Sequence, residues 1–223
     1  RAAAVRLARA AVQAVQSVQE TANAPEVILC PPYVYFEAVA QNLEAGVQLG
    51  AQDVAVPHHP KGAQTGDVSP MMLCDVGCTT VIIGHLERRL GHHEVNDTIR
   101  QKAESAWAVG LRVILCVGET AEERASGGSR LVVQEQVRAV VSGHRGIDPR
   151  PLIVAYEPAW AISGAGAATI TDITEMHQFL RNYLGSTLAS GAEVGLIYGG
   201  SVNAGNVADI LAIPDVDGVL VGS

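Results

Sequence analysis

The sequence predicts an α/β fold in which short parallel strands alternate with helices along a single domain. Apolar runs rich in β-branched residues recur along the chain, and each is followed by a stretch with apolar residues every three or four positions. Near-continuous apolar strands that alternate with amphipathic helices are typical of a parallel sheet covered by helices, either a closed barrel or a doubly wound sheet. The 223 residues are 48% hydrophobic, which is enough to bury one large core.

The order of the predicted elements follows from where these runs and spacings fall. Val5, Ala8, Val12 and Val15 lie on one helical face, so the chain opens in an amphipathic helix with no strand before it. Seven apolar runs are then predicted as strands, at residues 27–30, 47–54, 80–84, 111–117, 152–156, 194–198 and 218–221. Six further helices are predicted between them, at residues 36–43, 70–76, 96–109, 130–141, 172–188 and 204–211.

The count of elements favours a barrel over a doubly wound sheet. An eight-fold barrel of parallel strands needs one more strand at its start and one more helix at its end than this sequence holds. Residue 1 is Arg rather than Met, and the chain is shorter than the roughly 250 residues typical of such barrels. We therefore expect residues 1–223 to form one barrel domain that is incomplete at both ends, with seven of its eight strands present.

Composition and charge exclude several classes of function. The net charge is −8 and no lysine-arginine cluster is present, so a nucleic-acid or anionic-membrane partner has no electrostatic support. No apolar run reaches the roughly 18 residues of a membrane span and no signal segment is evident, so we expect a cytoplasmic protein. The four cysteines are expected to be reduced core thiols, and no metal site or cofactor is expected because Cys74 and Cys78 lack a second pair of ligands.

Two predicted strands lead into residues that could carry acid–base chemistry. One runs directly into Glu157, which Pro158-Ala159-Trp160 and then small residues follow, and this order suggests a general base beneath a lid. The strand at residues 80–84 leads into His85 and a second carboxylate, Glu87. Taken alone, a strand-end glutamate is more often solvated in a loop and a lone histidine more often structural. Because parallel strands end at one face of a barrel, the two strand ends should lie close together, which favours one site shared by Glu157 and His85.

The last two predicted strands end in small residues that suit an anion. Tyr198-Gly199-Gly200-Ser201 closes one strand, and Leu220-Val221-Gly222-Ser223 closes the other. Small residues let backbone N–H groups approach a phosphate closely, although glycine turns that serve only geometry remain the alternative. An acidic chain could hold an anionic substrate in this way.

Motifs along most of the chain resemble those of the triosephosphate isomerase family. The resemblance rests on Ile83-Gly84-His85-Leu86-Glu87-Arg88-Arg89, Cys116-Val117-Gly118-Glu119, Ala155-Tyr156-Glu157-Pro158-Ala159-Trp160-Ala161-Ile162, Tyr198-Gly199-Gly200-Ser201-Val202 and Val216-Asp217-Gly218-Val219-Leu220-Val221-Gly222. Matches at residues 49–53 and 62–67 extend it to the third strand of the family, and only about the first fifty residues match by pattern alone. It implies a (β/α)8 TIM barrel that interconverts dihydroxyacetone phosphate and D-glyceraldehyde 3-phosphate through an enediolate, in glycolysis and gluconeogenesis, without a cofactor.

The resemblance also implies roles for individual residues. Glu157 corresponds to the base and His85 to the electrophile that polarises the carbonyl oxygen, a pairing for which this family is itself the usual illustration. Glu87 corresponds to a second carboxylate that orients a lysine. The matching substrate-binding positions, of which Ile162 and Leu220 form an apolar clamp and the others supply backbone N–H groups to phosphate, are Ile162, Ser163, Ser201, Leu220, Gly222 and Ser223. Thr65 and Glu94 match positions at the dimer contact, so a homodimer is expected.

The chain departs from the family pattern at the first strand. The family's catalytic lysine lies in an Asn-x-Lys segment at the end of that strand, whereas this sequence has only Lys61 and Lys102, and neither matches. A chain without that lysine would be nearly inactive, because such charge stabilisation is typically worth several kcal/mol. We expect instead that these 223 residues belong to a longer chain whose first strand carries the lysine.

Smaller departures keep two other interpretations open. Leu86 stands where the family usually has a serine that hydrogen-bonds the glutamate, which could leave Glu157 less restrained. Ser163 and Ala165 replace usual glycines in the lid, and Gln64 replaces an aromatic residue at a loop tip. The chain could thus be an inactive or divergent relative that keeps the phosphate-binding barrel as a binding module. Another phosphate-binding barrel, of amino-acid biosynthesis, is a weaker alternative because it leaves the segment around Glu157 unexplained.

Overall fold

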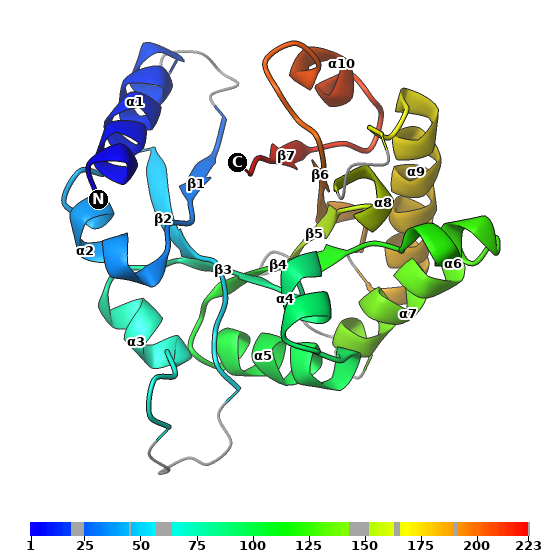
Figure 1. Ribbon diagram of the computed structural model, residues 1–223, viewed down its shortest axis with the longest axis horizontal. Helices are drawn as coiled ribbons and strands as arrows, with labels where there is room; N and C mark the ends of the chain where they lie inside the picture. The colour runs from blue at the N-terminus through cyan, green and yellow to red at the C-terminus, as the bar shows by residue number, and fades with distance from the viewer. Residues whose placement is uncertain are drawn as a thin grey trace. The chain divides into compact units, whose positions relative to one another are not determined.

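The computed structural model describes residues 1–18, 25–44, 46–56, 64–142, 152–162, 166–189 and 191–222. Over these residues, strands and helices alternate in the order that the sequence predicts, and the seven predicted strands are confirmed (Figure 1). The chain divides into two compact units, unit 1 with residues 1–83 and 104–113 and unit 2 with residues 84–103 and 114–223. In the described part of the chain, no helix has both the length and the apolar character needed to cross a membrane.

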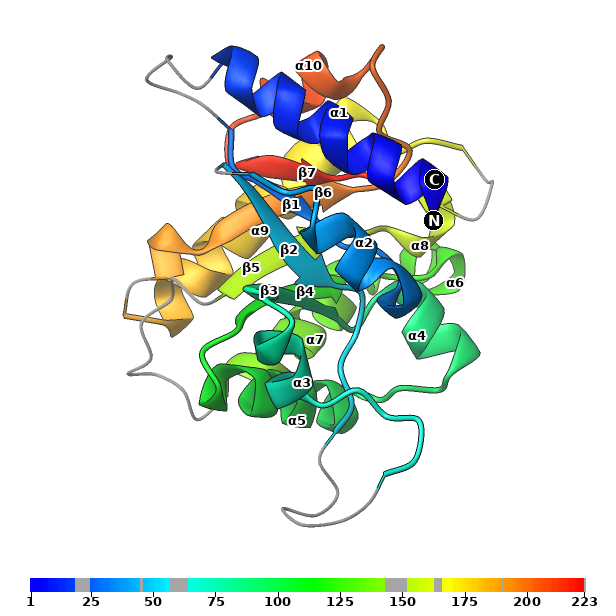
Figure 2. The ribbon, with the colours of Figure 1, turned by 90° about the vertical axis from the view of Figure 1, so that its left-hand side faces the viewer.

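Unit 1 is a helix-covered set of parallel strands. Its elements are α1 (Ala2–Val18), β1 (Val27–Leu29), η1 (Tyr33–Tyr35), α2 (Phe36–Ala40), β2 (Val47–Ala51), α3 (Pro70–Asp75) and β3 (Thr80–Ile83). The strands lie in the order β1-β2-β3, and both pairs are parallel. Figure 2 shows α1 and α2 over the same face of β1 and β2. Val12 and Val15 of α1 pack there against Val47, so the predicted opening helix is confirmed.

Unit 2 continues the alternation and contains most of the predicted site residues. Its elements are α4 (Leu86–Gly91), the start of α5 (Asn96–Ala108), most of β4 (Arg112–Val117), α6 (Ala121–Ala125), α7 (Ser129–Val141), β5 (Leu152–Tyr156), α8 (Ala159–Ile162), α9 (Ile170–Thr187), η2 (Gly191–Glu193), β6 (Gly195–Gly199), α10 (Val207–Leu211) and β7 (Gly218–Leu220). The strands lie in the order β4-β5-β6-β7. In the parallel register, Tyr156 pairs with Tyr198, and Gly199 pairs with Leu220. The residues that follow these strands therefore meet at one edge.

The structure also contains three short helices, α4, α6 and α8, that the sequence analysis did not predict. Each has only four to six residues, which is too short for an apolar periodicity to show. Local capping explains where two of them begin. His85 caps α4, and Thr120 caps α6 in a reciprocal capping box with Glu123. Of these helices, α4 and α8 contain or adjoin predicted functional residues, so they set the directions of those side chains.

The prediction of four core thiols is only partly right. Cys78 and Cys116 are buried and Cys30 is half-buried, but Cys74 is exposed. Cys74 lies on α3, which buries only Pro70 and Leu73 among its six residues. A position beside apolar residues in the sequence therefore did not put this thiol on the buried face of its helix.

Candidate active site

Glu157 is a buried carboxylate at the end of β5. Its N–H donates to the Val117 carbonyl at 2.7 Å, and the residue is only 4% exposed. Two glycines make room for it. A Cβ at Gly199 would lie 2.7 Å from Glu157 Cγ and 2.8 Å from Oε1, and a Cβ at Gly118 would lie 1.9 Å from the Glu157 carbonyl oxygen. Gly199 therefore leaves room for the side chain of Glu157, and Gly118 leaves room for its backbone. The sequence analysis, which considered Gly199 only for a phosphate-binding turn or a purely geometric one, did not include these two constraints.

His85 faces this carboxylate from the N-terminus of α4. The Glu87 N–H donates to His85 Nδ1 at 3.3 Å, and the other ring nitrogen, Nε2, lies 3.5 Å from Glu157 Oε1. A ring nitrogen that accepts a hydrogen bond carries no proton, so the neutral ring has its proton on Nε2. The helix cap thus presents a donor at the nitrogen that faces Glu157. The side chain of His85 is 27% exposed, which leaves it accessible to a ligand.

The surroundings of Glu157 favour a strong base. Burial raises the pKa of Glu157, and the nearby Glu87 charge raises it further, whereas His85, the Cys116 thiol and the Arg89 charge oppose the shift. Oε2 of Glu157 is buried and has no hydrogen-bond partner among the described residues. A buried carboxylate oxygen without a partner is costly in a purely structural role and is available to accept a proton.

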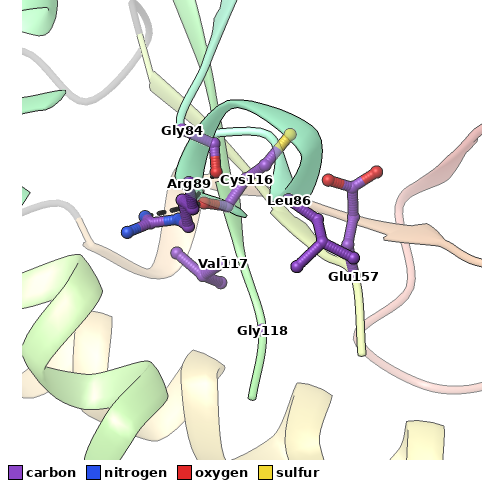
Figure 3. A pocket seen from close by; sticks show the side chains of 7 residues that line it. All are labelled: Gly84, Leu86, Arg89, Cys116, Val117, Gly118 and Glu157. Carbon is purple, nitrogen blue, oxygen red and sulfur yellow. Dashed lines mark hydrogen bonds between the residues drawn. The ribbon is translucent and has the colours of Figure 1, made fainter. Parts of the chain in front are cut away.

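Arg89 supports the site from beneath and was given no role in the sequence analysis. Its guanidinium donates to the Gly84 carbonyl at 2.7 Å, to Asn96 Oδ1 at 2.9 Å and to the Cys116 carbonyl at 3.2 Å (Figure 3). These bonds tie the residue before His85 to the end of β4 and the start of α5. The signal in the sequence was an arginine four residues after His85, close to the end of an apolar strand, where a charge must find partners.

The predicted substrate-binding residues that the structure describes lie at or just beyond the C-terminal ends of β6, β7 and α8. Ser201 and Gly222 are exposed, Leu220 is half-buried at the end of β7, and Ile162 is 42% exposed at the end of α8. Ser201 Oγ donates to the Ala161 carbonyl at 3.2 Å, which ties the loop after β6 to α8. The two other predicted positions, Ser163 and Ser223, lie outside the described residues.

The chain is similar in sequence to known proteins. The family model described as triosephosphate isomerase matches residues 3–223 of the chain. The chain belongs to the triosephosphate isomerase family. It is 42% identical over 200 residues to the triosephosphate isomerase of Roseiflexus castenholzii, covering 88% of this chain and 78% of the relative. It is also 43% identical over 199 residues to that of Brucella abortus, covering 88% and 77%, and 44% identical over 200 residues to that of Afipia carboxidovorans, covering 88% and 78%.

Membership of the triosephosphate isomerase family confirms two expectations. The fold class is the (β/α)8 TIM barrel, of which the described residues form seven strands, and the chain is an isomerase by class. The described residues contain no group of three or more His, Cys, Asp or Glu side chains that could hold a metal ion.

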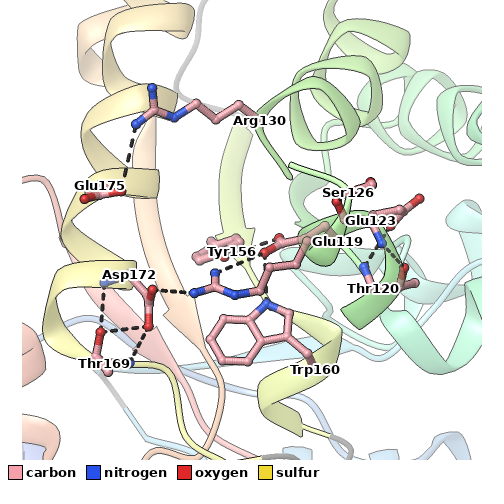
Figure 4. A network of polar contacts seen from close by, with 11 residues as sticks. Glu119, Thr120, Glu123, Ser126, Arg130, Tyr156, Trp160, Thr169, Asp172 and Glu175 are labelled. Atoms are coloured by element: carbon pink, nitrogen blue, oxygen red, sulfur yellow. Dashed lines mark hydrogen bonds and ion pairs between the residues drawn. The ribbon is translucent and has the colours of Figure 1, made fainter. Parts of the chain in front are cut away.

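A polar network fixes α8, the helix that follows Glu157. Glu119, with no exposed surface, accepts from Trp160 Nε1 at 2.9 Å and from the Tyr156 hydroxyl at 3.2 Å (Figure 4). The Arg124 guanidinium lies 4.1 Å above the centre of the Trp160 ring and donates to Asp172 at 2.6 Å. The network joins the ends of β4 and β5 to α8 and to the first turn of α9. The sequence analysis quoted Glu119 and Trp160 within motifs but gave them no role.

The positions predicted at the dimer contact differ in burial. Thr65 is exposed in the segment that precedes α3. The Glu94 side chain is only 6% exposed, and its Oε1 accepts from Lys102 Nζ at 2.6 Å and from Arg88 Nη2 at 2.5 Å. Lys102 is therefore engaged with Glu94. Lys61 lies outside the described residues.

Proposed function

We propose that this protein interconverts dihydroxyacetone phosphate and D-glyceraldehyde 3-phosphate, with Glu157 as the base and His85 as the electrophile. One observation carries the proposal. A buried carboxylate, one oxygen of which has no hydrogen-bond partner among the described residues, lies 3.5 Å from Nε2 of an imidazole whose Nδ1 accepts from a helix N–H. Membership of the triosephosphate isomerase family supports the choice of substrate.

The reaction is a proton transfer between adjacent carbons. Glu157 removes a proton from the carbon beside the carbonyl, the C–H electron pair forms the C=C bond of an enediolate, and the carbonyl π pair moves onto oxygen. Nε2–H of His85 donates a hydrogen bond to that oxygen as its charge grows, and a donor already in place costs no reorganisation. The hydroxyl proton of the deprotonated carbon then passes to the former carbonyl oxygen, with Nε2 of His85 giving one proton and taking the other. Glu157 returns its proton to the former carbonyl carbon, where the C=C pair forms the new C–H bond, while an oxygen lone pair forms the carbonyl on the deprotonated carbon. A base whose pKa is raised by burial suits this task, because the α-proton of a carbonyl compound is weakly acidic.

The substrate phosphate is proposed to bind backbone N–H groups at the strand ends. Ser201 and Gly222 lie exposed at the edge where β6 and β7 end, next to the seat of Glu157, and Ser163 and Ser223 would complete the set. Ile162 and Leu220 are proposed to close over the base as an apolar clamp. Backbone donors need no arginine, which fits a chain with a net charge of −8.

We further propose that Glu87 orients a lysine, and that the protein is a cytoplasmic homodimer with Thr65 and Glu94 at the contact. The Glu87 side chain is 88% exposed beside His85, which leaves its carboxylate open to a cation. Thr65 is exposed and available to a partner, while the two cations on Glu94 hold its loop in one conformation. Light scattering of the purified protein measures the dimer directly, and a monomer at micromolar concentration contradicts this part of the proposal.

A coupled assay in both directions, on the protein as its gene encodes it, tests the reaction. We expect interconversion, and in D2O we expect deuterium in the product at the carbon that receives the proton. The Glu157→Gln variant should lose both while it keeps the circular dichroism spectrum of the wild type. A folded wild-type protein that neither interconverts triose phosphates nor exchanges that proton would falsify the proposal.

A further inference from the structure

Hydrogen bonds hold the loop that follows β6 from several sides. Ser201, whose N–H is proposed to bind the substrate phosphate, is the middle residue of a tight turn, because the Val202 N–H donates to the Gly200 carbonyl at 2.7 Å. The Ser201 hydroxyl donates to the Ala161 carbonyl at 3.2 Å. The direction of the Ser201 N–H depends on the conformation of this turn, so whatever fixes the turn also affects phosphate binding.

The side chain of Asn206 binds the backbone of this loop at two points. Its Nδ2 donates to the Ser201 carbonyl at 2.8 Å, and its Oδ1 accepts from the Asn203 N–H at 2.8 Å. The Ser201 carbonyl and the Val202 N–H belong to one planar peptide group. Asn206 binds that group at the carbonyl and the Gly200 carbonyl binds it at the N–H, so its orientation is fixed at both ends.

These contacts differ from those expected at the position of Asn206. It is the N-cap residue of α10, where an asparagine usually accepts from an N–H group in the first turn of its own helix. The side chain makes no such bond, and both ends of its amide bind the loop instead. An asparagine that contacts the loop in place of capping its helix indicates a role in the loop.

We propose that Asn206 is a positioning residue for substrate binding: its amide holds the backbone around Ser201 in the conformation that binds the substrate phosphate. The inference rests on the proposed function, in which Ser201 is one of the phosphate-binding residues. Asn206 acts through the loop and not by contact with the substrate. Without its two bonds the loop would adopt other conformations, and the affinity for phosphate would fall with the fraction of molecules that keep the binding one.

Three variants test this proposal. Asn206→Asp keeps the shape of the side chain and the acceptor for the Asn203 N–H, but it loses the donor to the Ser201 carbonyl. Asn206→Ala removes both bonds without adding a charge. Asn203→Asp is the matched control, because it adds the same charge to the same loop and keeps the oxygen that accepts from the Gly205 N–H at 2.8 Å. Circular dichroism checks that each variant folds.

The measurements separate phosphate binding from the rest of the site. Calorimetric titration gives the Kd of inorganic phosphate at constant ionic strength, and steady-state assays give kcat/KM for the triose phosphates. Proton exchange of D-glyceraldehyde in D2O reports the same chemistry on a substrate without phosphate. In Asn206→Asp and Asn206→Ala we expect the Kd to rise and kcat/KM to fall about 10-fold, the effect of losing one or two hydrogen bonds, with D-glyceraldehyde exchange unchanged. Asn203→Asp should match the wild type in all three measurements.

Several results would overturn the proposal. If Asn206→Ala binds phosphate as tightly as the wild type, or if Asn203→Asp weakens it as much as Asn206→Asp, the effect is one of charge alone. If D-glyceraldehyde exchange falls as much as kcat/KM, Asn206 supports the whole site and not phosphate binding. A folded wild type that binds no phosphate also contradicts the proposal. If it binds phosphate but does not isomerise triose phosphates, the proposed function fails, while the phosphate titrations still decide the role of Asn206.

Discussion

Two buried glutamates follow neighbouring strands of unit 2, and their surroundings differ in one respect. Glu119, two residues beyond β4, has no exposed surface and accepts hydrogen bonds from Trp160 and Tyr156. Glu157, directly after β5, is almost as buried, but its Oε2 has no hydrogen-bond partner in the described part of the chain. The hydrogen bonds to Glu119 suit a structural role, whereas the unpaired oxygen of Glu157 suits a catalytic one.

The comparison extends to the neighbours of each carboxylate. Glu119 is surrounded by donors with large side chains, and burial and the Glu119 charge raise the pKa of Tyr156, so that hydroxyl stays a proton donor. Glu157 is flanked by Gly199 and Gly118, which contribute no side chain. Large donors therefore restrain one carboxylate, while the other packs against a glycine that offers it no side-chain donor.

The largest effect on activity is expected when the carboxylate of Glu157 is removed. Glu157→Gln removes the proposed base but keeps its shape, so kcat/KM should fall by about 10²- to 10⁴-fold. The free energy of unfolding at pH 8 should stay the same or rise, since a buried charge has been removed. Steady-state kinetics and urea unfolding measure the two effects. Glu119→Gln is the matched control, and a loss of activity as large as that of Glu157→Gln would show that the two glutamates do not differ in role.

A smaller loss of activity is expected when the glycine that packs against the Glu157 side chain is replaced. In Gly199→Ala the new Cβ would lie 2.7 Å from Glu157 Cγ, so the carboxylate must move away from His85. We expect kcat/KM to fall about 10- to 100-fold, because catalysis is sensitive to displacements of about 1 Å. Gly195→Ala, on the same strand, is the control, since its Cβ would meet only Ile153 at an ordinary 3.5 Å. Equal activity in the two variants would contradict a positioning role for Gly199.

The proposed structural role of Glu119 is tested by its effect on the free energy of unfolding. The amide of Gln can accept with only one oxygen, so Glu119→Gln leaves a buried donor unpaired and weakens the contact with Arg124. We expect the free energy of unfolding to fall by about 1–3 kcal/mol, measured in urea. Glu122→Gln changes an exposed carboxylate on the adjacent helix and should have little effect. A Glu119→Gln protein as stable as Glu122→Gln would mean that the network contributes nothing.

Sequence patterns could predict the residue types at the site but not their surroundings. Glu157 and His85 were predicted because each directly follows an apolar strand, which is a local signal. The protonated nitrogen of His85 could not be predicted, because it depends on the cap of a six-residue helix with no periodicity. The partner of Glu119 lies 41 residues away at Trp160, and such a contact exists only once β4 and β5 are placed in one sheet.

The last and smallest effect is on the pH dependence of stability. Because burial raises the pKa of Glu157 in the folded state, the folded protein holds this proton more tightly than the unfolded chain. The stability that this group contributes is therefore fully present below the ordinary glutamate pKa and is lost as the pH rises through the raised folded-state value. The difference in free energy of unfolding between wild type and Glu157→Gln should shift in favour of the variant over that window. The acidic limb of kcat/KM should rise over the same pH window, because the ionisation that creates the base also adds a buried charge to the folded protein.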